Sequence, residues 1–265
     1  MFELFLFVSF VFVLVRHRFY WKVTEGSIFE KENNVFMAHR GQTYNVPENT
    51  LESFQDAIKT GFDWIELDLV TTKDGIIVCS HNFDLERETN GKGWINETDS
   101  AALDYLRTGV YTHPSNTKEL PLLKNVVLSL PKTVGYNFEL KTFTLFDFSM
   151  IRPLMALIKE EKIEKYVVSS FNPFLMGIIK LFYPFVKIGF LLEERKYLWF
   201  THWIHPNYLH PRADMVDDEL IKLSIDHNIE ILVWTVNSIG GIQWCKDNNI
   251  KGIITDSDAH SINYI

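Results

Sequence analysis

Short apolar runs typical of β-strands alternate with helical patterns along most of this chain, from residue 34 onward. After the first run, Leu51, Phe54 and Ile58 give a helix one apolar face, and Gly61 marks its end. Eight such units in about 230 residues favour a single α/β domain, a (β/α)8 barrel of the TIM type. The predicted strands are Val35–Ala38, Trp64–Val70, Tyr136–Leu140, Tyr166–Ser169, Val186–Phe190, Tyr208–His210, Ile231–Thr235 and Gly252–Thr255.

A further strand is predicted at Ile76–Ser80, directly after the second barrel strand. The intervening residues 71–75 are too few for a parallel crossover, so the pair should form an antiparallel hairpin. A turn centred near Asp74 returns His81 to a place beside Leu67. The predicted barrel domain covers residues 34–265.

Two other local features shape the predicted barrel. Residues 82–131 contain no good barrel element and are expected to form an insertion of loops and short helices over one end. Asn49, with Glu52 three residues later, has the spacing of a capping box and is predicted to cap the first barrel helix.

Glu66 and Asp68 stand two residues apart in the apolar second strand. Since a strand alternates its faces with period two, both carboxylates point to the same side. Two acids on one face of an apolar strand repel each other and resist desolvation, and a divalent cation would relieve both effects. The alternative is a half-solvated strand whose acids face water.

Polar residues also follow the other predicted strands, where barrel enzymes carry their catalytic groups. Carboxylate oxygens are hard ligands, suited to Mg²⁺ or Ca²⁺, whereas Arg and Lys bind anions and a pair of histidines can act as general acid and general base. Together they fit phosphodiester cleavage. Taken singly, a strand-end histidine, a lysine or a tryptophan is more often structural. The set comprises His39, Arg40, Glu66, Asp68, His81, Glu139, Lys141, Asn172, Trp234 and Asp256.

Composition excludes several classes of protein. The chain has 265 residues, enough for one large domain, and a net charge of −8, which argues against a nucleic-acid-binding surface. Its two cysteines, Cys79 and Cys245, lie in apolar runs and are expected to be core residues.

The N-terminal residues 1–22 differ from the rest. Leu4 to Val15 is apolar apart from Ser9, and Arg16-His17-Arg18 follows at once. We expect a hydrophobic helix that anchors the protein to a membrane, with the basic flank leaving the catalytic domain in the cytoplasm. The alternatives are a cleaved signal of an exported protein and a helix that only docks on the barrel.

The ordered motifs of the chain resemble those of the glycerophosphodiester phosphodiesterase family, from about residue 36 to 258. The resemblance implies a (β/α)8 barrel and metal-dependent hydrolysis of glycerophosphodiesters to glycerol 3-phosphate and an alcohol. The motifs are His39-Arg40-Gly41, Pro47-Glu48-Asn49-Thr50, Glu66-Leu67-Asp68-Leu69, Thr72-Lys73-Asp74-Gly75, His81, Phe138-Glu139-Leu140-Lys141, Ser170-Phe171-Asn172-Pro173 and Trp234-Thr235-Val236-Asn237.

The resemblance also implies roles for these residues. His39 and His81 would be the acid/base pair, and Arg40 and Lys141 would hold the substrate phosphate. The insertion would help to shape the glycerol pocket. The metal, Mg²⁺ or Ca²⁺, would be bound by Glu66, Asp68 and Glu139, and the substrate pocket would include Trp234 and Asn172.

Two departures from the family pattern stand out. The family commonly has His-Asp where this chain has His81-Asn82, so an orienting carboxylate is missing, and Asp84 is a candidate substitute. Lys124-Asn125 stands where acidic residues are usual.

Three other functions compete with this one. The first is a lysophospholipase D-type hydrolysis of membrane lysolipids, favoured by the N-terminal segment and by Tyr197-Leu198-Trp199-Phe200 with Trp203, although those aromatic residues also suit ordinary helix packing. The second is a non-catalytic barrel that binds phosphodiesters. The third, an aldolase-type barrel, needs Lys141 as a Schiff-base lysine.

Overall fold

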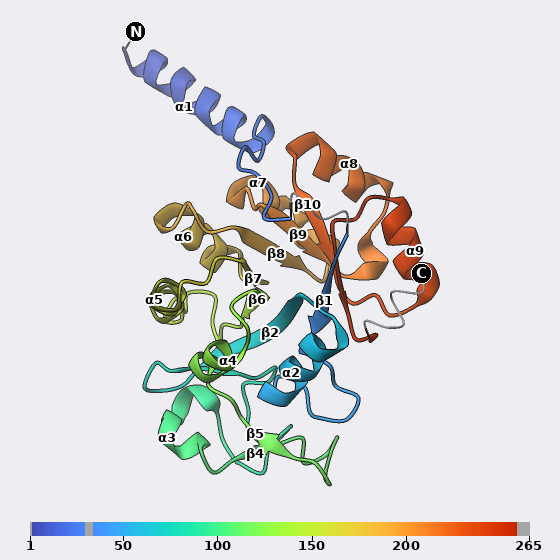
Figure 1. Cartoon of the computed structure of the whole chain (residues 1–265). Helices are drawn as coiled ribbons and strands as arrows, with labels where there is room; N and C mark the ends of the chain where they lie inside the picture. Colours follow the sequence, from blue (N-terminus) through green and yellow to red (C-terminus); the bar gives the residue numbers. More distant parts are fainter. Residues whose placement is uncertain (1, 30–33, 259–265) are drawn as a thin grey trace.

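The computed structural model describes residues 2–29 and 34–258, so the predicted segment bounds at residues 1 and 265 lie outside the described part. Eight parallel strands form a closed barrel, in which β1 pairs with both β11 and β2 (Figure 1). The predicted TIM barrel is therefore confirmed. Its strands are β1 (Val35–His39), β2 (Trp64–Thr71), β6 (Gly135–Leu140), β7 (Tyr166–Ser170), β8 (Ile188–Leu192), β9 (Tyr208–Pro211), β10 (Glu230–Val233) and β11 (Gly252–Thr255).

Helices on the outside of the barrel connect these strands. Their inward faces carry the apolar residues that form the large core between helices and strands. They are α2 (Leu51–Thr60), α4 (Leu123–Ser129), α5 (Ile151–Glu161), α6 (Pro173–Phe182), α7 (Thr201–Ile204) after the 3-10 helix η2 (Arg195–Phe200), α8 (Asp218–His227) after the 3-10 helix η3 (Ala213–Met215), and α9 (Ile239–Asp247).

The start of α2 differs from the prediction. Thr50, not Asn49, is the N-cap, and its side chain exchanges hydrogen bonds with Ser53 in a capping box. Asn49 instead has a positive φ of 54° and donates its side-chain amide to Asp68 Oδ2 at 2.9 Å. The prediction of Asn49 as the cap was wrong. Both residues can cap a helix, but the side chain of Asn49 contacts Asp68 on the second strand, and Thr50 is the cap. Gly61 ends α2 in the left-handed conformation, as predicted.

The predicted antiparallel hairpin is present. β3 (Ile77–Cys79) pairs with the end of β2, with Leu69 opposite Cys79. The next residue continues the pairing, since the backbone N–H of Ser80 donates to Asp68 O at 3.0 Å. The chain therefore returns to the second strand immediately before His81.

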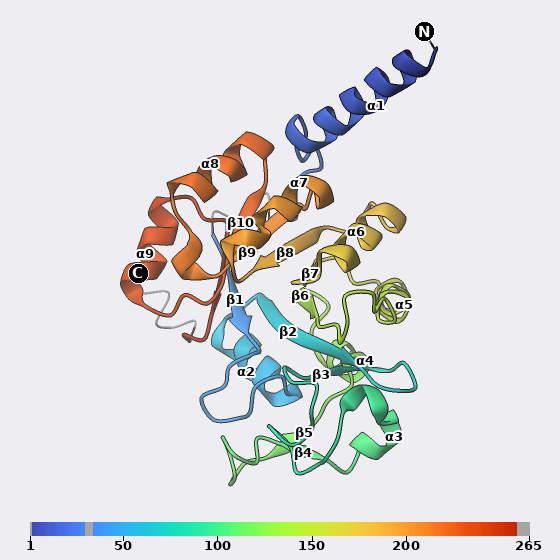
Figure 2. The same ribbon diagram turned by 180° about the vertical axis from the view of Figure 1, so that it is seen from behind.

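The segment after His81 forms a small layer of its own, with an apolar core that includes Val70, Leu85, Ile95 and Leu103. In both views this layer lies at the opposite side of the molecule from the N-terminal helix (Figures 1 and 2). Its elements are η1 (Ile95–Glu97), α3 (Ser100–Leu103), β4 (Arg107–Thr108) and β5 (Lys118–Glu119).

A separate core fills the barrel interior. Phe29 is fully buried there, with its ring 4.8 Å from that of Trp64 and 5.4 Å from that of Tyr208. The segment before β1 thus supplies a side chain to the inside of the barrel.

The N-terminal helix α1 (Phe2–Phe19) extends away from the barrel and contacts α7 at its base (Figure 1). Just beyond it, Trp21 is stacked between the rings of His205 and His227. Among the described residues no helix is both long and apolar enough to cross a membrane, so the expectation of a spanning anchor is not supported.

Candidate active site

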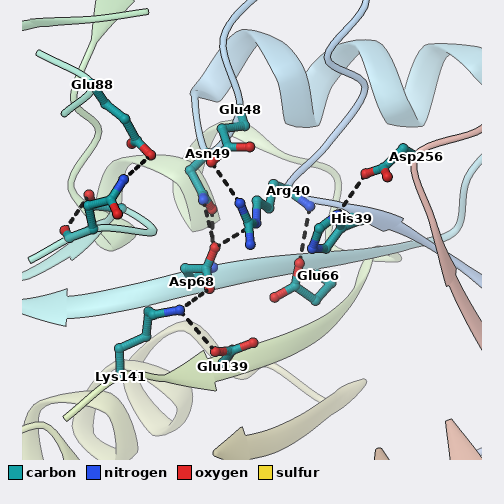
Figure 3. Close-up of polar contacts among 12 residues, drawn as sticks. His39, Arg40, Glu48, Asn49, Glu66, Asp68, Glu88, Glu139, Lys141 and Asp256 are labelled. Carbon is teal, nitrogen blue, oxygen red and sulfur yellow. Dashed lines mark hydrogen bonds and ion pairs between the residues drawn. The ribbon is translucent and has the colours of Figure 1, made fainter. Parts of the chain in front are cut away.

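A cavity of about 290 Å³ opens among the carboxyl ends of the barrel strands. Seven of the predicted site residues line it: His39, Arg40, Glu66, His81, Glu139, Lys141 and Trp234. Asp68 is buried and contacts two of these side chains, Arg40 and Lys141 (Figure 3). The topology therefore brings together residues that are far apart in the sequence.

Glu66, Asp68 and Glu139 form an acidic cluster in this cavity wall. Strand pairing places Asp68 beside Glu139, and each residue offers a carboxylate oxygen within 4.8 Å of the other two. Burial and repulsion from Asp68 raise the pKa of Glu66 to about 8, and the same two causes raise the pKa of Glu139. The cluster therefore resists carrying three negative charges unless cations accompany it.

Two cationic side chains partly neutralise the acidic cluster. Arg40 Nε lies 3.0 Å from Asp68 Oδ2, and Lys141 Nζ lies 3.1 Å from Asp68 Oδ1 and 3.2 Å from Glu139 Oε1 (Figure 3). Burial disfavours ionised Asp68, but Lys141 and Arg40 outweigh burial and lower its pKa. Arg40 is held by a second bond, from Nη1 to Glu48 Oε1 at 2.8 Å.

The acidic cluster fits a hard divalent cation. Glu66 Oε1 is buried without a hydrogen-bond partner among the described residues, which is costly for a carboxylate oxygen. All the potential ligand atoms are oxygens, as Mg²⁺ and Ca²⁺ prefer. Lys141 contacts two of the three carboxylates, so it and a cation would compete for the same oxygens.

The two predicted catalytic histidines have different surroundings. The ring Nδ1 of His39 lies 2.7 Å from Asp256 Oδ1, and Asn237 donates to the other oxygen of Asp256 at 2.7 Å. Burial would lower the pKa of His39, but Asp256 and Glu66 outweigh it and raise the pKa. Burial, with smaller contributions from nearby cations, lowers the pKa of His81 to about 4.

The two predicted pocket residues behave differently. Trp234 lines the cavity, and its indole N–H donates to His210 O at 2.7 Å, which fixes the ring. Asn172 does not line the cavity. Its side-chain oxygen caps α6 by accepting from the N–H groups of Phe174 and Leu175, and its amide donates to Thr142 Oγ1 and Leu145 O.

The structure also shows the contacts of the residues at the two departures from the family pattern. Asp84 forms an ion pair with Arg87 at 3.0 Å and does not substitute for the missing carboxylate. Asn82 donates its side-chain amide to Glu88. Lys124 forms an exposed ion pair with Glu160 at 3.1 Å.

Sequence reasoning missed several contributors to the site. Asp256 follows the last predicted strand, but nothing in the sequence indicates that it contacts His39. Glu48 and Asn49 lie in a quoted motif, although their contacts with Arg40 and Asp68 could not be read from it. Asn137, which lines the cavity, had no signal beyond facing the same way as Glu139 on β6.

Comparison with known proteins places this barrel among the hydrolases of phosphoric diesters. The chain belongs to the glycerophosphodiester phosphodiesterase family: the family model described as "Glycerophosphoryl diester phosphodiesterase family" matches residues 39–259. The family, the fold and the enzyme class predicted from the motifs are thereby confirmed.

Individual relatives agree with this assignment. A glycerophosphodiester phosphodiesterase from Caldanaerobacter subterraneus subsp. tengcongensis is 30% identical over 234 residues, covering 86% of this chain and 96% of the relative. Glycerophosphodiester phosphodiesterase 1 from Mus musculus is 42% identical over 257 residues, covering 83% and 77%.

The fold is also similar to solved structures. A phosphodiesterase from Oleispira antarctica, solved in complex with the product sn-glycerol-3-phosphate, superposes with a TM-score of 0.79 at 23% identity, covering 86% of this chain and 95% of that one.

The contact between His39 and Asp256 predicts a measurable change in the pKa of the histidine. Replacing Asp256 with Asn removes the negative charge that stabilises protonated His39, so the pKa of His39 should fall. NMR titration of the imidazole signals would measure it, with the exposed Asp104→Asn as the matched control. An unchanged His39 titration in Asp256→Asn would contradict the assigned contact.

Proposed function

We propose that the enzyme hydrolyses glycerophosphodiesters to glycerol 3-phosphate and an alcohol, with His39 and His81 as general acid and base. One observation carries the proposal: two histidines with oppositely shifted pKa values line one cavity together with the acidic cluster, Arg40 and Lys141. Groups whose surroundings push their pKa values apart are suited to opposite proton-transfer roles.

The cationic side chains would bind the phosphoryl group. Arg40 presents a planar fork that suits phosphate oxygens, and Lys141 adds a point charge next to it. Both are largely buried, where their interaction with an anion is stronger than in water.

The environments of the histidines suggest how the proton-transfer roles are divided. His81, neutral in the free enzyme, would take the proton from the hydroxyl that forms a bond to phosphorus. That hydroxyl belongs either to water or to the neighbouring glycerol carbon. The bond from phosphorus to the departing alcohol oxygen then breaks. His39, whose protonated form is stabilised by Asp256, would give its proton to that oxygen. Where the glycerol hydroxyl attacks, the cyclic phosphate that forms is then opened by water to give glycerol 3-phosphate.

Glu66, Asp68 and Glu139 would hold the divalent cation, Mg²⁺ or Ca²⁺. When bound, such a cation supplies positive charge that stabilises the phosphoryl oxygens in the transition state. The orphan oxygen of Glu66 and the raised pKa values of Glu66 and Glu139 support this assignment.

Removing either histidine should reduce turnover of glycerophosphocholine by about 100- to 10,000-fold, since each moves a proton in the transition state. His39→Ala and His81→Ala would be compared with His17→Ala, an exposed histidine on α1 that lies outside the cavity. Wild-type turnover in both cavity variants would overturn the proposed function.

The acidic cluster predicts metal dependence. EDTA should abolish turnover, and Mg²⁺ or Ca²⁺ should restore it. Glu139→Gln should raise the cation concentration needed for half-maximal turnover, because one anionic ligand is lost, whereas the exposed Glu97→Gln should not. Activity that persists in EDTA would show that the carboxylates are structural.

A second candidate function, hydrolysis of lysolipids, is favoured by an apolar rim, by which we mean Phe171 at the cavity and exposed apolar side chains in the segments after β6 and β7. Phe171 lines the cavity and is partly exposed, and Leu145, Phe146 and Phe174 are exposed in the segments after β6 and β7. The rings of Phe146 and Phe174 lie 5.2 Å apart. A rim of this kind offers a surface for one acyl chain. The aromatic segment after β8 contributes less, since Leu198 and Phe200 pack on the core.

Helix α1 suggests where the enzyme acts. Its apolar side chains, from Leu4 to Val15, are exposed around the whole helix, and Arg16 and Arg18 follow at its base. We propose that α1 attaches the barrel to a lipid surface, with the basic residues favouring the cytoplasmic leaflet and export as the alternative.

Vesicles would test both lipid-related proposals. Phe146→Ser should lower turnover of a lysolipid in vesicles several-fold while leaving glycerophosphocholine turnover unchanged, because only the lysolipid carries an acyl chain. Equal effects of Phe146→Ser on both substrates would exclude acyl-chain recognition by the rim.

The attachment of α1 to lipid is tested separately. Phe10→Asp should lower co-sedimentation of the full chain with anionic vesicles. Undiminished sedimentation of Phe10→Asp would exclude α1 as the attachment.

A further inference from the structure

A carboxylate outside the acidic cluster lies beside His81. Glu48, His81 and Glu88 each offer one ring nitrogen or carboxylate oxygen, and these atoms lie within 4.8 Å of one another. The described residues include no hydrogen-bond partner for the ring nitrogens of His81. A carboxylate of this group is therefore close enough to act on the ring.

The two carboxylates in this group are engaged differently. Glu48 forms an ion pair with Arg40 at 2.8 Å and so helps to fix that side chain. Glu88 accepts a hydrogen bond from the side-chain amide of Asn82, and it has no ion-pair partner among the described residues (Figure 3). Glu88 is thus the carboxylate that is tethered next to His81 but not committed to a cation.

We propose that Glu88 is a positioning residue for His81: it orients the imidazole and stabilises the positive charge that forms when His81 accepts a proton. The proposal rests on the assigned role of His81 as the general base. Asn82 has the supporting task of holding Glu88 in place through its amide.

The electrostatics explain why such a partner is needed. Protonation of His81 is opposed by burial and by Lys141, Arg40 and His39, and among its strongest neighbours only Asp68 favours it. Asp68 is shared with Arg40 and Lys141. A second carboxylate near the ring therefore lowers the free energy of the protonated state that the reaction passes through.

The carboxyl group of Glu88 changes its charge near neutral pH. Burial and repulsion from Glu48 raise the pKa of Glu88 to about 7, Asp68 adds to this rise, and Arg40 and the Asn82 amide oppose it. Once His81 carries a proton, the attraction between the two groups favours ionised Glu88. The carboxylate is therefore available as an anion when it is required.

The test replaces Glu88 with Gln in the full chain, assayed with glycerophosphocholine at a Mg²⁺ concentration that just saturates the wild type. Glu88→Gln should lower kcat by about 10- to 100-fold with KM within about twofold, as expected for a group that supports another residue and does not bind substrate. The exposed Glu97→Gln, in the same insertion, is the matched control and should keep wild-type kcat.

The pH profile separates positioning from a purely structural role. In the wild type kcat/KM should fall as the pH drops through about 7, because protonation of Glu88 removes its charge. This limb should be absent in Glu88→Gln and present in Glu97→Gln. A Glu88→Gln variant with unchanged kcat and an unchanged pH profile would overturn the proposal.

A double variant tests the contact directly. In Asn82→Asp/Glu88→Gln the donor and acceptor of the hydrogen bond are exchanged and a carboxylate is returned to the pair, so part of the lost kcat should return. If Glu88→Gln does not fold, two other variants decide the question: the double variant and Glu88→Asp. Both would be compared with the wild type by thermal unfolding and by kcat. A wild-type-like double variant supports the proposal, whereas inactivity of both variants contradicts it.

Two further outcomes distinguish positioning by Glu88 from cation binding and from a failure of the proposed function. Recovery of Glu88→Gln by excess Mg²⁺ or Ca²⁺ would mean that Glu48, His81 and Glu88 hold a cation, and it would contradict positioning. Wild-type turnover in His81→Ala would refute the role of His81 as the general base, on which the proposal rests, whereas an inactive His81→Ala beside a fully active Glu88→Gln would refute only the role of Glu88.

Discussion

The repulsion among three carboxylates, two of them buried and one half-buried, is the constraint around which the barrel mouth is organised. Glu66, Asp68 and Glu139 lie within 4.8 Å of one another, and burial magnifies their mutual repulsion. Arg40 and Lys141 contact Asp68 from separate strand ends and keep it ionised. Glu66 remains without such a partner among the described residues. The site is thus held together by charge pairs that leave a deficit of positive charge, which a divalent cation can relieve.

Backbone strain in the loop after β1 serves the same network. Arg40 and Asn49 have positive φ values of 58° and 54°, in a region that costs a residue other than glycine about 1–3 kcal/mol. Both side chains contact Asp68 from these conformations. Buried, charge-assisted contacts of this kind are strong enough to offset the strain. The loop conformation follows from the charge of Asp68, and in turn places the guanidinium group in the cavity.

The sequence predicted the features that follow from period and chain length. The common direction of Glu66 and Asp68 needs only the alternation of a strand, and the return of His81 needs only a five-residue connection. The misses depend on three-dimensional choices between similar residues. Thr50 and Asn49 can both cap a helix, and Thr50 is the residue that caps α2. Asp84 and Glu88 are both acids near His81 in the sequence, but Asp84 pairs with Arg87 whereas Glu88 accepts from Asn82. Each outcome depends on side-chain reach. Asn172 shows the converse case, a motif residue whose polar atoms are used inside the fold.

The difference between the two histidines follows from where each lies in the barrel. His39 ends β1, next to β11, so Asp256 from the end of β11 can contact its ring and favour the protonated form. His81 lies on the returning arm of a hairpin, outside the barrel order, where the next residues belong to the insertion. Of the two carboxylates grouped with its ring, Glu48 is paired with Arg40, and Glu88 belongs to the insertion. The surroundings of His81 therefore depend on the sequence of the insertion, whereas Asp256, the partner of His39, belongs to the barrel.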